Sequence, residues 1–149
     1  MVRLRLTDLN FNGRVNLIDE HFEVLKTIVH EFLVVDEDLS LQEVVAKKLI
    51  ETGKTLGIAE SCTGGYISHL MTQMAGSSAF FLGSVVSYSN ELKSDALNVP
   101  EHIIKKFGAV SNQTVEYMAE GIRKLAKSDY GLATSGIMGP SGGSDEKPV

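Results

Sequence analysis

The amino-acid sequence predicts a protein of the α/β class, because short apolar runs typical of strands alternate with amphipathic runs typical of helices. The clearest case is residues 55–59, an apolar run that we interpret as a short buried strand, followed by the amphipathic run 66–74. Ile67, Leu70, Met71 and Met74 in the second run recur at the spacing of one helix face. Residues 83–88 and 130–135 are two further strand-like runs.

Composition and charge exclude several classes of protein. A chain of 149 residues fits one domain, or one domain plus a fragment of another. No apolar run approaches the ~18 residues of a membrane span, and no secretory leader is visible, so we expect no membrane partner and a cytoplasmic location. The single cysteine fits a reducing compartment. The net charge of -5 and the lack of a Lys/Arg cluster argue against a nucleic-acid partner.

The first 36 residues have the pattern of a separate α+β piece. Residues 2–7 alternate apolar and polar positions, as an edge strand does, and residues 10–13 are turn-like. An amphipathic helix is expected from about residue 17, and residues 32–35 are expected to return as a short strand. These elements leave much apolar surface uncovered. We therefore expect residues 1–36 to be a fragment, joined by the acidic linker 36–38 to a domain over 37–149.

The helices of that domain carry recognisable end signals. Ser40 and Glu43 form a capping box, and Gly53 follows at the position of a C-terminal glycine. Pro100 is expected at the first position of a short helix that ends at Gly108. Ser111 is expected to cap the next helix. The buried stripes are expected to comprise Leu41, Val44, Val45 and Leu49 in the first of these helices, and Val115, Met118, Ala119, Ile122 and Leu125 in the last.

The turn between the run 55–59 and the helix 66–74 carries reactive side chains. Ser61, Cys62 and Thr63 lie there, followed by Gly64 and Gly65. A turn of this kind exposes side chains at the carboxyl edge of a sheet beside unpaired N–H groups, which suits a serine nucleophile with an oxyanion hole. The alternative is that Ser61 or Thr63 only caps the helix. Cys62 is the rival nucleophile, but no histidine at a strand end is available to activate it.

Lys93 is the candidate base for that serine. Ser89 or Asn90 is expected to cap a short helix, which places Lys93 near its first turn, just past the strand that ends at Tyr88. If this strand lies beside the Ser61 strand, the amine can reach the hydroxyl. Desolvation and the positive end of a helix would lower its pKa, as a neutral base requires. Serine with lysine is a known alternative to serine with histidine, although a surface charge is the plainer interpretation.

The loop 136–144 has four glycines and follows the last strand. Such a loop can present N–H groups to a phosphate, but it matches neither a P-loop nor a dinucleotide fingerprint. The four histidines are dispersed, and no HExxH or CxxC motif occurs. His69 is expected to be an ordinary helix residue. We therefore expect no metal and no cofactor.

Several short blocks, taken together and in order, resemble the carboxyl-terminal domain of the CinA family (competence-damage-inducible protein), whose enzymatic members are nicotinamide-nucleotide amidases. The resemblance runs from about residue 40 to the end. The matching blocks are residues 59–65, 76–78, 81–83, 85–90 with Lys93, 108–111, 136–137, 139–140 and 146–149. Residues 2–7 and the helix after them resemble the end of the family's small middle domain.

The resemblance implies a three-layer α/β/α sandwich that forms homo-oligomers and hydrolyses a small-molecule nucleotide, nicotinamide mononucleotide, to nicotinate mononucleotide and ammonia. It makes Ser61 the nucleophile and Lys93 its base. We add that N–H groups near Thr63, Gly64 and Gly65 would hold the oxyanion, and that Tyr88 would stack on the cationic ring. The expected substrate-binding residues are Tyr88, Asn90, Ser135, Gly136 and Gly139, and the loop 136–143 would take the phosphate.

Departures from the family pattern leave a second reading open. Ser135 stands where threonine is common, and the bulky Met138 where a small residue is common, so Met138 would narrow the pocket. The family domain continues past residues 146–149 with another strand and helix, so we expect this polypeptide to be truncated. The alternative function is a catalytically silent nucleotide-binding or assembly domain.

Overall fold

The computed structural model describes residues 6–7, 16–145 and 147–149. The chain divides into two compact units, Met1–Val44 and Val45–Val149. The boundary expected after residue 36 and the truncation remain predictions. The strand expected over residues 2–7 falls almost entirely outside the described residues.

The described part of the first unit contains helix α1 (Asn16–Ile28). The short strand expected over residues 32–35 is wrong, because the chain there makes turns instead. The Phe32 N–H donates to the carbonyl of Val29, 2.8 Å away, so this segment closes on the helix that precedes it. A strand needs a partner to pair with, and the described residues of this unit contain none.

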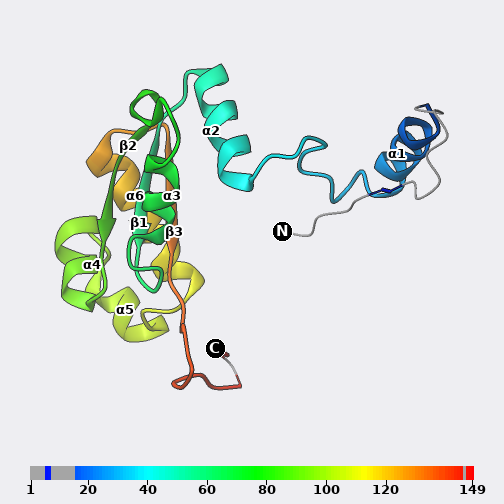
Figure 1. The fold of residues 1–149 in the computed structure, drawn as a ribbon. Coiled ribbons are helices and arrows are strands. Elements are labelled where there is room, and N and C mark those ends of the chain that lie inside the picture. Colours follow the sequence, from blue (N-terminus) through cyan, green and yellow to red (C-terminus); the bar gives the residue numbers. More distant parts are fainter. Residues whose placement is uncertain (1–5, 8–15, 146) are drawn as a thin grey trace. The chain divides into compact units, whose positions relative to one another are not determined.

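The second unit is built on a parallel sheet of three strands in the order β2-β1-β3, as Figure 1 shows. Strand β1 (Leu56–Glu60) lies in the centre and pairs with β2 (Phe81–Val86) on one side and β3 (Tyr130–Thr134) on the other. Every residue of β1 is buried, which explains its apolar run without alternation. The predicted α/β class is confirmed.

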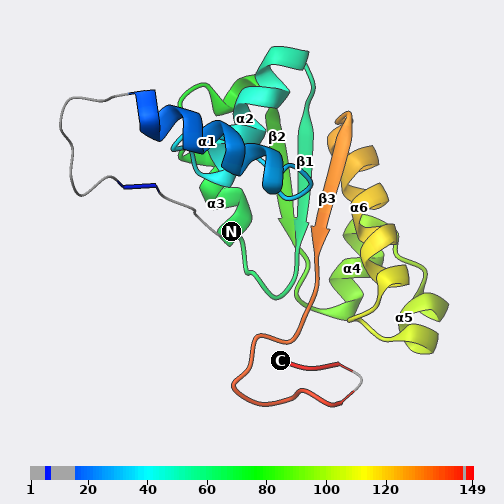
Figure 2. The same ribbon diagram turned by 90° about the vertical axis from the view of Figure 1, so that its right-hand side faces the viewer.

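Helices cover both faces of this sheet and complete the three layers visible in Figure 2. One face packs Leu56, Ile58 and Phe80 against Ala46 and Leu49 of α2 (Leu41–Thr52) and Met71 of α3 (Tyr66–Thr72). The other packs Ala59 against Leu97 of α4 (Asn90–Leu97), Ile104 of α5 (Glu101–Phe107), and Met118 and Ile122 of α6 (Asn112–Ala126). Since strand residues alternate between faces, the chain beyond Ala59 sends Glu60 toward α3 and Ser61 toward α4.

Most predicted helix ends are confirmed by their hydrogen bonds. The Ser40 N–H donates to the Glu43 carboxylate at 2.7 Å, as a capping box requires. The Ser111 hydroxyl accepts the Thr114 N–H at 3.2 Å. Gly53 has a φ of 62°, the left-handed conformation that favours glycine after a helix.

Three expectations about the helices are wrong in detail. Pro100 precedes α5 as its N-cap instead of standing at its first position. Leu41 and Leu125, expected in buried stripes, have about half of their surfaces exposed, at 49% and 57%, because each lies near a helix end, beyond the packed part of the sheet face. The helix expected over residues 66–74 is shorter: α3 ends at Thr72, and a short 3-10 helix (Ser77–Ala79) leads into β2.

No helix in the described ranges is long and apolar enough to cross a bilayer.

Candidate active site

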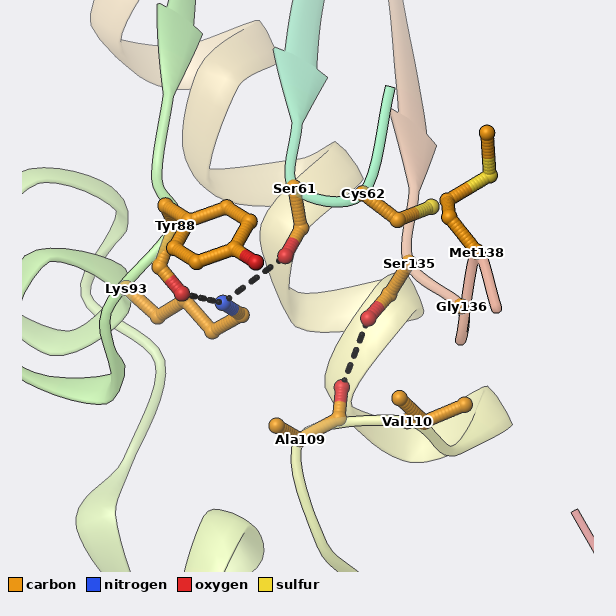
Figure 3. Close-up of a pocket in the computed structure, with 9 residues that line it drawn as sticks. All are labelled: Ser61, Cys62, Tyr88, Lys93, Ala109, Val110, Ser135, Gly136 and Met138. Atoms are coloured by element: carbon orange, nitrogen blue, oxygen red, sulfur yellow. Dashed lines mark hydrogen bonds between the residues drawn. The ribbon is translucent and has the colours of Figure 1, made fainter. Parts of the chain in front are cut away.

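A cavity of about 280 Å³ lies where the strands end. Its walls come from the residues after β1, β2 and β3 and from the loop between α5 and α6 (Figure 3). The lining residues are Ser61, Cys62, Tyr88, Lys93, Ala109, Val110, Ser135, Gly136 and Met138. Carboxyl ends of parallel strands are the usual place for a ligand in an α/β fold.

Ser61 is the first residue after the central strand. Its N–H donates to the carbonyl of Thr134 at 3.0 Å, which continues the pairing of β1 with β3 by one residue. The residue is 8% exposed, so its hydroxyl is held in a nearly closed environment. The turn beyond it is tied to the same strand, because the hydroxyls of Thr63 and Thr134 are 2.9 Å apart. The candidate nucleophile therefore stands at the end of the central, fully buried strand of the sheet.

The side chain of Lys93 reaches Ser61 from α4, the helix that follows the neighbouring strand β2. The Ser89 hydroxyl caps α4 by accepting the Leu92 N–H at 3.1 Å, which confirms one of the two expected caps. Although lysine is usually a surface residue, Lys93 is only 1% exposed. Its Nζ lies 3.2 Å from the Ser61 Oγ (Figure 3). The same amine donates to the carbonyl oxygens of Ser87 at 2.7 Å and Tyr88 at 3.2 Å.

These contacts indicate which protonation state of the Lys93 amine can act as a base. Carbonyl oxygens only accept hydrogen bonds, so Ser87 and Tyr88 each take one N–H of the amine. Burial lowers the pKa of Lys93 below its usual 10.5, while the nearby Cys62 thiol opposes that shift. The carbonyl of Ser89 is more distant, at 3.5 Å, so a neutral amine that gives its two N–H groups to the two nearer carbonyls keeps its lone pair for the Ser61 hydroxyl. This is the arrangement of a base beside its nucleophile.

Glu60, one residue before the serine, is fully buried and points into α3. Its carboxylate accepts the N–H groups of Gly65 and Ile67, both at 3.1 Å, and that of Ser68 at 2.8 Å. Burial opposes ionisation of this group, but hydrogen bonds led by the Ser68 hydroxyl outweigh it and hold the pKa of Glu60 below its ordinary value. The start of α3 is therefore neutralised by a carboxylate from the strand that precedes it.

The structure brings together only some of the residues predicted for the site. Ser61, Lys93, Tyr88, Ser135 and Gly136 line the cavity. Asn90 and Gly139 do not: Asn90 is the exposed first residue of α4, and Gly139 packs against Val149. The functional roles of these residues remain predictions.

The three positions expected to supply the oxyanion hole also lie outside the lining residues. The N–H of Gly64 donates to the carbonyl of Ser61 at 3.2 Å, and that of Gly65 to Glu60. Two of those three N–H groups are therefore already engaged within the protein. The N–H of Thr63 takes part in none of the hydrogen bonds of the described chain.

Sequence reasoning gave no role to Ala109 and Val110, which form the floor of the cavity in Figure 3. Their only signal was the block 108–111, which opens at the end of one helix and closes at the cap of the next. The Ser135 hydroxyl donates to the Ala109 carbonyl at 2.9 Å and joins this floor to the end of β3. Met138, 70% exposed, stands on the side away from Lys93.

The chemistry available at this site is acyl transfer by a serine with an amine base. Within the described residues, no three His, Cys, Asp or Glu side chains are grouped so that they would hold a metal ion. A buried hydroxyl, a buried amine with a lowered pKa and an adjoining cavity are the parts that a serine hydrolase requires.

Comparison with known sequences gives a consistent result. A family model described as the CinA C-terminal domain matches residues 38–149. A CinA-like protein of Prochlorococcus marinus is 48% identical over 134 residues, which are 90% of this chain and 31% of that protein. A CinA-like protein of Thermotoga neapolitana is 47% identical over 148 residues, 99% of this chain and 36% of that protein. The chain thus spans about a third of the length of these curated relatives.

Solved structures agree with the sequence comparisons. The competence damage-inducible protein A of Klebsiella pneumoniae superposes with a TM-score of 0.70 at 40% identity, covering 72% of this chain and 67% of that one. A competence-damaged protein (CinA) superfamily member from Escherichia coli gives a TM-score of 0.71 at 29% identity, covering 78% and 69%. Both of these proteins share the fold of this chain and also part of its sequence.

Proposed function

The chain belongs to the CinA family, and from this premise we propose that it is an amidohydrolase that converts nicotinamide mononucleotide and water to nicotinate mononucleotide and ammonia. The observation that carries the proposal is the 3.2 Å contact between the Nζ of Lys93 and the Oγ of Ser61, with both residues buried at the edge of a cavity. Burying a lysine is costly, and a lysine that is 1% exposed and faces a serine hydroxyl has the arrangement that a base needs.

In the proposed reaction the neutral amine of Lys93 takes the proton of the Ser61 hydroxyl as the oxygen attacks the carboxamide carbon. The carbon becomes tetrahedral, and its carbonyl oxygen becomes an oxyanion. Lys93, now an ammonium, gives its proton to the carboxamide nitrogen, and the carbon–nitrogen bond breaks to release ammonia. The serine is left as an acyl ester.

Water then hydrolyses the acyl ester, and Lys93 again acts as the base. Lys93 removes a proton from a water molecule, whose oxygen attacks the ester carbon, and then returns a proton to Ser61 as the carboxylic acid leaves. Because one amine acts in both halves, the chemistry needs no second titrating side chain. Lys93 is held by the carbonyls of Ser87 and Tyr88, so its nitrogen can remain in place throughout.

The cavity walls suit a flat cationic ring. Tyr88 lines the cavity and is 77% exposed, so its ring is free to stack on a pyridinium. Val110 and Met138 supply apolar surface on the other sides. We assign the phosphate to the glycine loop that begins at Gly136, and we expect the protein to act as a homo-oligomer.

The test is ammonia release from nicotinamide mononucleotide by this chain and by its Ser61→Ala variant, with binding of the nucleotide measured by calorimetry on both. We expect the parent to release ammonia and the variant to bind the nucleotide without releasing it. A parent that binds the nucleotide and releases no ammonia would instead support a silent nucleotide-binding domain. The same assay on a longer form that includes flanking segments asks whether those segments contribute to turnover.

A further inference from the structure

The Ser61 turn has a definite set of free hydrogen-bond donors. Between residues 61 and 69, the N–H groups of Gly65, Ile67 and Ser68 donate to the Glu60 carboxylate, and those of Ser61, Gly64, Tyr66 and His69 donate to main-chain carbonyls. Within residues 61–69, which the structure describes throughout, the N–H groups of Cys62 and Thr63 are the two without an acceptor. Buried or half-buried N–H groups are nearly always paired, so two consecutive unpaired donors beside a nucleophile need an explanation.

We propose that the N–H groups of Cys62 and Thr63 form the oxyanion hole, and that Glu60 is the positioning residue that keeps the start of α3 out of this role. The inference rests on the proposed amidase function and deepens it. It moves the anion site from Gly64 and Gly65 toward the serine. Cys62 lines the cavity, and Thr63, which is not among the lining residues, is the next residue along the same turn.

The distribution of charge around the turn supports this placement. The carboxylate of Glu60 already accepts the N–H groups of Gly65, Ile67 and Ser68, so a second anion at those donors would face a buried negative charge. The N–H of the residue after the nucleophile is also the donor that serine hydrolases with a strand-to-helix nucleophile turn commonly use. The N–H groups of Cys62 and Thr63 are the ones left for the oxyanion.

Glu60 also fixes the geometry of the two free donors. Its main chain ends β1, and its side chain holds the first turn of α3, so both ends of the turn 61–65 are attached to one residue. The Thr63 hydroxyl ties the middle of the turn to Thr134. Donors that are fixed before the reaction stabilise a developing charge without reorganisation, and removing one such donor costs about 10²–10³-fold in kcat.

A boronic acid gives a direct view of the anion site. Pyridine-3-boronic acid has the ring of nicotinamide, with boron in place of the carboxamide carbon. The Ser61 oxygen adds to the trigonal boron, an oxygen–boron bond forms, and the hydroxyl proton passes to Lys93. The boronate that results is tetrahedral and negatively charged, like the oxyanion intermediate, and no bond to a leaving group breaks.

The experiment is amide proton NMR of the ¹⁵N-labelled chain with and without saturating pyridine-3-boronic acid, with boron NMR to detect the adduct. We expect large downfield shifts of the Cys62 and Thr63 amide protons and small ones at Gly65, Ile67 and Ser68. An adduct that shifts Gly65 and leaves Cys62 unmoved would overturn the inference while leaving the amidase proposal intact. Failure to form any adduct on Ser61 would count against both.

Glu60→Gln tests the positioning role separately. Glutamine keeps the shape of the side chain, but its NH₂ group faces main-chain donors, so the turn loosens. We expect kcat to fall by up to about a hundredfold with KM little changed. The pH range over which kcat/KM rises as Lys93 loses its proton should stay the same as in the parent. Glu101→Gln makes the same change in the first turn of α5, at a residue that does not line the cavity, and should behave as the parent. Equal kcat in Glu60→Gln and the parent would contradict the role assigned to Glu60.

Discussion

Replacing Lys93 with methionine tests the proposed chemistry most directly. Methionine fills a similar volume at a position that is 1% exposed, and it removes only the amine. Within the described residues, no other titratable side chain forms a hydrogen bond with the Ser61 hydroxyl, so the variant has no base. General-base catalysis contributes about 10²–10⁴-fold, so we expect kcat/KM for nicotinamide mononucleotide to fall by at least about a hundredfold, or about 2.7 kcal/mol in the barrier.

The effect of Lys93→Met on folding has opposing parts. The carbonyl oxygens of Ser87 and Tyr88 lose the donor that they share, and each unsatisfied buried group costs about 1–3 kcal/mol. Against this, the variant no longer has to remove an amine from water on folding. We therefore expect a net change in unfolding free energy of at most about 3 kcal/mol, which urea denaturation will measure.

Lys93→Arg is the control that separates charge from basicity. Arginine keeps the positive charge and the donors to the two carbonyls, but its pKa lies far too high for it to act as a base. Both variants should therefore be inactive in the ammonia assay while remaining folded. A folded Lys93→Met or Lys93→Arg protein that kept more than about a tenth of the parent's kcat/KM would refute the assignment of Lys93 as the base, since a loss that small is below what a general base contributes.

Three further outcomes follow from the structure. Because only neutral Lys93 acts as base and burial lowers its pKa below 10.5, kcat/KM should rise with pH on a limb that ends below that value; a profile that falls toward alkaline pH would contradict this. In Gly121→Ala the new Cβ meets the main chain of Leu97 in α4, so urea denaturation should show a loss of about 1–3 kcal/mol. Asp129 accepts hydrogen bonds from Lys54 and Thr55, which lower its pKa from 3.8 to about 2. Its contribution to stability is therefore complete above the unfolded value and is lost as pH falls toward 2, and the acid unfolding of Asp129→Asn should lack that component.

A last substitution concerns the floor of the cavity. Ser135→Ala removes the hydrogen bond to the Ala109 carbonyl that joins β3 to the loop between α5 and α6, but it leaves Ser61 and Lys93 untouched. We expect KM for the nucleotide to rise more than kcat falls, in steady-state ammonia assays. If instead kcat and kcat/KM fall by the same factor and KM is unchanged, the floor of the cavity acts on the chemical step itself.

The residues that build the sheet and the Ser61–Lys93 contact could be predicted from the sequence because their signals are local. The apolar run of β1, the glycines after Ser61 and the Ser89 cap each mark an element end within a few residues. Parallel neighbours bring such ends to the same edge, so the approach of Lys93 to Ser61 required only that β1 and β2 be adjacent. That adjacency was an assumption at the sequence level, and the structure supplies it.

The features that sequence reasoning missed depend on the direction of a side chain or on a partner far along the chain. Glu60 received no role of its own in the sequence analysis, because nothing in its neighbourhood showed that its carboxylate turns into α3. The strand expected over residues 32–35 had the right composition but found no pairing partner among the described residues of its unit. Ala109 and Val110 became cavity residues only because α5 and α6 place their loop beneath Ser135.

These contacts divide the site into a rigid half and an adaptable half. Ser61 is fixed by the central strand and by Glu60, and Lys93 by a capped helix and two carbonyls, so the reacting atoms depend on hydrogen bonds that lie inside the fold. The side chains of Tyr88 and Met138 line the cavity, are mostly exposed and make none of these contacts. If the proposed amidase function holds, changes at these exposed positions should alter which carboxamide binds while the serine, the amine and the two free N–H groups keep their places, so substrate choice would be separable from catalysis within one small cavity.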